Sequence, residues 1–170
     1  APVELLLQTF VNGLVLGAGY AVVAVGLTLI FGIVGIANFA HGAYFALGAY
    51  ACHLLTGQGL NYFLALPLSV LLVAAVGLIT ELAVVRRSLY SEAHHSSLIV
   101  MFALGQAVVA ALILIFGPDP HPVPSPLGQT TFTLFGIFVT AQRAFIFVCS
   151  AVVLAGFGLW LAYTVKGQQL

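Results

Sequence analysis

Charged residues are almost absent from this sequence. Only four Lys or Arg and four Asp or Glu occur in 170 residues, a charged fraction of 5%, against about 25% in a typical soluble domain. This scarcity excludes a water-soluble globular protein, a disordered chain and a nucleic-acid binder that depends on basic patches. Because 62% of the residues are hydrophobic and the mean hydropathy is +1.20, the sequence predicts an integral membrane protein.

The few charges divide the chain into apolar stretches. No charge occurs from Leu5 to Thr80, a stretch too long for one helix, and the breakers Gly32, Gly35 and Asn38 interrupt it. The later uncharged stretches are each about one bilayer crossing long, since a crossing needs roughly 20 apolar residues. We therefore predict an all-α polytopic bundle, forming a single transmembrane domain over residues 1–170, with about five spans: 6–31, 41–55, 62–85, 98–116 and 144–163.

The segment between the last two predicted spans differs from the rest. Residues 117–126 contain five prolines and cannot be helical. Residues 129–140 then alternate polar with apolar side chains around Gly136, which predicts a short β-hairpin on the membrane surface. A buried apolar connector is the alternative.

The basic residues predict an orientation. Under the positive-inside rule Arg86, Arg87 and Lys166 lie on the cytoplasmic side. With five spans, this places the N-terminus, residues 57–61 and residues 117–142 outside.

Signals for catalysis are missing. The sequence has no nucleophile with an adjacent base, no glycine-rich phosphate loop and no carboxylate pair. The adjacent His94 and His95 cannot both face one metal ion from a helix, so we expect no metal site and no enzyme activity. Glu81 precedes Arg86 by five residues, and we interpret Glu81 as part of an interfacial ion pair or as a snorkelling carboxylate rather than as a proton relay.

Polar side chains inside the first span indicate helix packing. Gln8 and Asn12 lie one turn apart on the same face, as do Gly13 and Gly17. Hydrogen bonds between helices and close backbone approach at glycine are typical of buried membrane helices. We therefore expect the first span to be buried inside the bundle.

The densest signal is the break between the first two spans. Residues 35–42 (GIANFAHG) combine helix breakers, an amide, an imidazole and an aromatic ring. Irregular backbone at membrane depth is tolerated where it is buried in protein or lines a cavity, and it can then bind a polar solute. One interpretation is a substrate-path or gating element. The other is a tight turn in which Asn38 and His41 cap the second helix.

The same residues carry a family resemblance. Residues 11–43, which include Asn-Gly-Leu at 12–14, a Gly-Leu-Thr-Leu-Ile-Phe-Gly run and Asn-Phe-Ala-His-Gly at 38–42, resemble permease subunits of bacterial branched-chain amino acid ABC transporters. Residues 114–126 (LIFGPDPHPVPSP) are similar to the family's external segment. Thr164 and Gly167 resemble the start of its cytoplasmic T-x-x-G segment.

The resemblance implies a function and a set of partners. The protein would form half of a pore that imports branched-chain amino acids across the bacterial inner membrane by alternating access. It would work in membrane lipid with a second, homologous permease, two cytoplasmic ATP-binding subunits and a periplasmic or lipid-anchored binding protein, and with no nucleic acid. The partners would use the ATP, and this chain would bind no cofactor.

The resemblance also implies roles for particular residues. Asn38, Phe39, Ala40, His41 and Gly42 would line or gate the path, and Thr164 and Gly167 would begin the segment that contacts the ATPase. Family members continue past T-x-x-G through a coupling segment and further helices. We therefore expect the 170 residues to be an N-terminal portion that does not transport by itself.

Three alternatives stay open. A sibling importer for urea, short amides or other amino acids would share the fold and differ only in its pocket. A passive channel of the aquaporin kind would need a second Asn-x-Ala triplet beside Asn38–Ala40, and the sequence has none. A non-transporting membrane fragment is the third.

Overall fold

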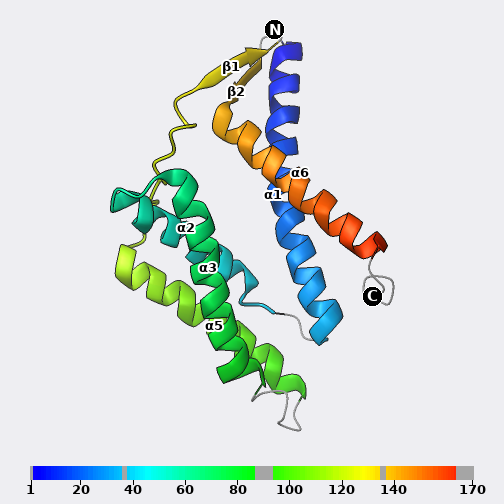
Figure 1. Cartoon of the computed structure of the whole chain (residues 1–170), viewed down its shortest axis with the longest axis vertical. Helices are drawn as coiled ribbons and strands as arrows, with labels where there is room; N and C mark the ends of the chain where they lie inside the picture. Colours follow the sequence, from blue (N-terminus) through cyan, green and yellow to red (C-terminus); the bar gives the residue numbers. More distant parts are fainter. Residues whose placement is uncertain (1, 36–37, 87–93, 135–136, 164–170) are drawn as a thin grey trace. The chain divides into compact units, whose positions relative to one another are not determined.

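The computed structural model describes residues 2–35, 38–86, 94–134 and 137–163 (Figure 1). These residues form the α-helices α1 (Pro2–Val34), α2 (His41–Gly57), α3 (Tyr62–Thr80), α5 (His94–Phe116) and α6 (Ala141–Tyr163). A π-helical turn, η1 (Glu81–Val85), continues α3, and two strands, β1 (Thr131–Leu134) and β2 (Ile137–Thr140), precede α6. The predicted helical membrane protein is confirmed.

Four helices in the described part of the chain are long and apolar enough to cross a membrane: Val3–Gly32, Tyr62–Val84, Leu98–Phe116 and Ala141–Tyr163. Most of their side chains are exposed in this chain, including large apolar ones such as Leu114. Helices that are apolar on every side can be covered by lipid, because all their backbone groups are paired internally. The 17 residues of α2 extend about 26 Å at about 1.5 Å per residue, and its crossing stays a prediction.

The chain divides into two compact units, Ala1–Val34 with Ser125–Leu170, and Gly35–Pro124. In the first unit α1 packs against α6, and β2 contacts both helices (Figure 1). In the second unit α2 packs against α3 and α5, while η1 packs against α5.

The predicted hairpin within 129–140 is confirmed. Strands β1 and β2 are antiparallel, with Thr131 opposite Thr140 and Leu134 opposite Ile137. The Ala141 N–H donates to the Thr130 carbonyl at 2.8 Å, which closes the open end of the hairpin. Helix α6 therefore begins directly at the hairpin, earlier than the predicted 144.

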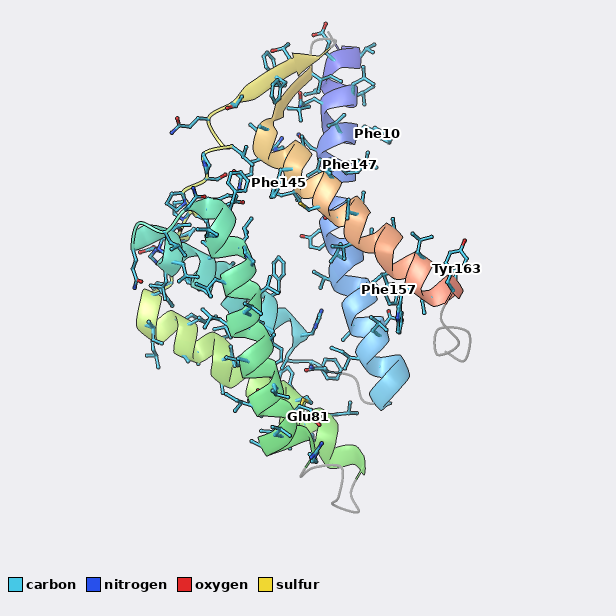
Figure 2. The ribbon with its side chains drawn as sticks, in the orientation of Figure 1. Phe10, Glu81, Phe145, Phe147, Phe157 and Tyr163 are labelled. Atoms are coloured by element: carbon cyan, nitrogen blue, oxygen red, sulfur yellow. The ribbon has the colours of Figure 1, made fainter. Side chains whose placement is uncertain are left out.

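Two helix ends differ from the prediction. The span predicted for 98–116 begins earlier, because α5 starts at His94 and a helix can continue beyond its apolar stretch into polar sequence. At the end of α3, where Figure 2 labels Glu81, the helix widens into η1 and the Arg86 N–H donates to the Glu81 carbonyl. Arg86 Nε lies 3.7 Å from Glu81 Oε1, so the predicted ion pair is confirmed.

Candidate functional site

The break between α1 and α2 contains the motif at 38–42. Helix α1 ends at Val34, and Gly35 has a φ of +72°. This left-handed conformation commonly ends a helix and favours glycine, which has no Cβ to clash with the backbone. The motif therefore begins after a defined helix end and runs into the first turn of α2, which starts at His41.

Asn38 organises the turn that leads into α2. Its side-chain Oδ1 accepts a hydrogen bond from the Ala40 N–H at 3.0 Å, and its carbonyl accepts from the His41 N–H at 3.1 Å. The Ala40 carbonyl then accepts from the Tyr44 N–H at 3.1 Å, which begins the helical ladder. The Asn38 side chain therefore stabilises the turn that precedes α2, while the N-cap position itself, Ala40, makes no side-chain cap hydrogen bond, so capping of α2 by Asn38 stays a prediction.

Ala40 anchors the turn against α5. It is fully buried, with 0% of its surface exposed. A Cβ placed on Gly105 would lie 3.2 Å from the Ala40 Cα and 3.3 Å from the Phe39 carbonyl oxygen. The backbone of the turn thus approaches α5 at a position where only glycine leaves enough room. The sequence analysis did not single out Gly105, because a lone glycine in an apolar helix gives no signal of its partner.

The five motif residues do not share one environment. Phe39 is 60% exposed, while its neighbour Ala40 is buried. Asn38 and His41 are half-buried, and Gly42 is exposed. A predicted role in lining the path can therefore belong to Phe39, His41 or Gly42 through exposed surface, and to Ala40 only through the backbone it positions. That these residues line or gate a solute path stays a prediction.

One buried polar atom lies one turn into α2. The Tyr44 hydroxyl is buried and has no hydrogen-bond partner among the described residues. Leaving such a group unpaired costs about 1–3 kcal/mol. The Tyr44 hydroxyl, two residues after the motif, is therefore a buried group that could still form a hydrogen bond.

The polar residues of α1 join three elements of the first unit. Gln8 Nε2 donates to Asn12 Oδ1 at 3.3 Å and to the Phe138 carbonyl at 3.0 Å, while Gln8 Oε1 accepts from the Phe138 N–H at 2.8 Å. Asn12 Oδ1 also accepts a hydrogen bond from the Arg143 guanidinium of α6. The two amides therefore hold α1 to the hairpin and to α6.

Gly13 and Gly17 of α1 have no close neighbour among the described residues, although close packing was expected there. A Cβ on Gly13 or Gly17 would meet no atom within 4 Å, and none of the most apolar window of α1 is buried. Within its own compact unit α1 is therefore not buried, and its burial inside a bundle stays a prediction. An all-apolar helix is equally suited to lipid or to another chain, so its sequence does not specify its neighbour. Packing at Gly13 and Gly17 stays a prediction that requires a neighbour beyond these residues.

Other predicted positions carry less information. Thr164 and Gly167 lie outside the described residues, as do the side chains of His94 and His95. Among the residues that are described, no group of three or more His, Cys, Asp or Glu side chains could hold a metal ion.

Comparisons with known proteins agree on one family. A family model described as "Branched-chain amino acid transport system / permease component" matches residues 9–170. The chain is 28% identical over 177 residues to the high-affinity branched-chain amino acid transport system permease protein BraD of Pseudomonas aeruginosa, covering 95% of this chain and 57% of that protein. It is 48% identical over 44 residues to the LivH permease proteins of Escherichia coli and Salmonella typhimurium, covering 26% of this chain and 14% of each relative. No solved structure matches.

Proposed function

Because the chain belongs to the permease component family of branched-chain amino acid transport systems, we propose that it contributes to the membrane pore of an ATP-driven importer of branched-chain amino acids. The family match over residues 9–170 is the observation that carries this proposal. The chain covers 57% of the length of BraD, so the activity of the whole subunit is part of the proposal.

We place the solute path at the start of α2. Residues 38–40 precede α2 and belong to neither apolar helix, and their backbone is fixed by Asn38 and by contact with Gly105. Irregular backbone between apolar helices presents N–H and C=O groups that can bind the charged ends of an amino acid. His41, half-buried at the first position of α2, adds a side chain with both donor and acceptor capacity beside that backbone.

The energy would come from other subunits. A permease component moves a solute without making or breaking its bonds, so ATP hydrolysis would take place in two cytoplasmic ATP-binding subunits. An external binding protein would deliver the solute, and a second permease would complete the pore. Alternating access would then open the turn at 38–42 first to one side of the membrane and then to the other.

Uptake of radiolabelled leucine tests the proposal. The subunit containing this chain is produced in bacteria with the ATP-binding subunits, second permease and binding protein encoded beside it. We expect uptake that isoleucine and valine inhibit and that an ATPase-inactive partner abolishes. Uptake of urea or a short amide in place of leucine would indicate a sibling importer, and uptake without the ATP-binding subunits would indicate a channel.

A His41→Ala variant tests the placement of the path within that assay. We expect uptake to fall while the amount of subunit in the membrane is unchanged, and Gly77→Ala, on the open surface of α3, is the matched control. Normal uptake by His41→Ala would assign His41 to helix capping alone.

A further inference from the structure

A ring cluster in the second unit brings together two histidines that are 68 positions apart in the sequence. His53 lies in the last turns of α2, and His121 lies in the proline-rich segment after α5. Their ring centroids are 5.2 Å apart. Tyr50 and Phe116 pack beside them, with centroids 4.5 Å apart. The sequence analysis considered His94 and His95 and did not pair His53 with His121.

Each histidine of this pair is held by one ring nitrogen. His53 Nδ1 lies 2.8 Å from the Pro122 carbonyl oxygen, and His121 Nε2 lies 2.8 Å from the Phe116 carbonyl oxygen. A carbonyl oxygen can only accept, so both of these nitrogens carry the proton. In the neutral rings the lone pairs therefore remain on His53 Nε2 and His121 Nδ1.

This arrangement is the one that metal-binding histidines use. A ligating imidazole almost always donates its other N–H to a carbonyl or carboxylate, which fixes the tautomer and the ring orientation. Two imidazoles that bind one tetrahedral ion at about 2.0–2.1 Å have ring centroids about 5 Å apart. The measured separation of 5.2 Å agrees with that geometry.

We propose that His53 and His121 form a binding site for a divalent transition-metal ion that prefers imidazole, such as Cu²⁺ or Zn²⁺. Two side chains supply part of the coordination, and water or a group from another molecule fills the open positions. The ion would tie the proline-rich segment to the end of α2. The site makes use of two histidines to which the proposed transport function assigns no role.

Titration with Cu²⁺ tests this site. The chain is reconstituted in lipid nanodiscs at neutral pH as the His94→Gln/His95→Gln variant, which leaves His41 as the one histidine outside the proposed site. We expect one bound Cu²⁺ per chain, with an electron paramagnetic resonance spectrum that shows two imidazole nitrogens. His53→Gln and His121→Gln should each reduce the number of nitrogens to one and weaken binding by at least about 10-fold, because removing a ligand costs no less than removing the group that supports it.

The outcomes are separable. Equal Cu²⁺ affinity in the double variant His53→Gln/His121→Gln would overturn the proposal. A spectrum without two imidazole nitrogens in the His94→Gln/His95→Gln chain would also overturn the proposal, and this test requires no substitution at His53 or His121. Loss of Cu²⁺ binding on the His94→Gln/His95→Gln change alone would place the metal elsewhere and overturn it as well. Circular dichroism of each variant confirms that the helices are retained.

Discussion

The side-chain amide of Gln8 pairs with both backbone groups of Phe138. Oε1 accepts from the Phe138 N–H at 2.8 Å, and Nε2 donates to its carbonyl at 3.0 Å. Phe138 is opposite Thr133 in the hairpin, so the amide pairs with the edge of β2 as a neighbouring strand would. Two residues 130 positions apart thereby fix the hairpin to the first turns of α1.

Replacing Gln8 should loosen the hairpin locally. Gln8→Ala removes both bonds to Phe138, and because they are exposed to solvent we expect a loss of about 1 kcal/mol in local stability. A loss of this size corresponds to about fivefold faster exchange of the Phe138 amide proton, measured by hydrogen–deuterium exchange. Gln8→Glu keeps an oxygen that can accept from the Phe138 N–H, so its amide exchange rate at Phe138 should lie between those of the unchanged chain and Gln8→Ala. Thr9→Ala, which removes only a bond to the Leu5 carbonyl, is the control and should leave exchange at Phe138 unchanged.

A side chain at Gly105 should destabilise the second unit. Because the nearest atoms are backbone atoms of Phe39 and buried Ala40, the turn cannot move aside as a flexible side chain would. We expect Gly105→Val to cost about 1–3 kcal/mol, the usual penalty for overpacking, and to lower the melting temperature in detergent. Gly77→Val in α3, where a Cβ meets no atom within 4 Å, is the matched control. Equal melting temperatures for the two variants would contradict the close contact.

Substitutions at Asn38 separate its two candidate roles. Asn38→Ala removes the acceptor for the Ala40 N–H and should cost about 0.5–1.5 kcal/mol, the net contribution of one hydrogen bond. Asn38→Ser restores an acceptor oxygen, so we expect the melting temperature to recover. If the amide also contacts the solute, leucine uptake should stay low in Asn38→Ser. Recovery of uptake together with stability would leave Asn38 a capping role only.

The predicted orientation can be measured by cysteine labelling. In a Cys52→Ala/Cys149→Ala background, Gln58→Cys lies in the exposed segment between α2 and α3. We expect a membrane-impermeant maleimide to label it in intact cells, because the positive-inside rule places this segment outside. Glu92→Cys, beside Arg86 and Arg87 in the sequence, should react only after the membrane is opened. The reverse pattern would show that the chain has the opposite orientation.

Local patterns in the sequence were enough to predict most of the elements. The charge-free stretches predicted the helical membrane class, and alternation in 129–140 predicted the hairpin, because each depends on residues near one another in the chain. The ion pair of Glu81 with Arg86 is also local. The helix ends shifted by a few residues, for example at Ala141, at His94 and at both ends of α1.

Contacts between distant segments were not predictable in the same way. Gly105 against Ala40, Gln8 with Phe138 and His53 beside His121 each join residues separated by 65 positions or more, and no periodicity records such pairs. The motif at 38–42 was located correctly as a break, yet its split between exposed Phe39 and buried Ala40 depends on where α5 lies. The neighbour of α1 could not be predicted for the related reason that apolar side chains do not identify what covers them.

The wide turn η1 gives one continuous helix two different neighbours. Five residues of an α-helix cover about 500°, which would leave Arg86 on the side of the helix away from Glu81. The π-helical turn takes up one additional residue and thereby rotates Arg86 by about 100° relative to its place in an unbroken α-helix. Helix α3 packs against α2, and η1 packs against α5. The extra residue in this turn thus brings Arg86 to the side of Glu81 without a proline or a loop in the helix.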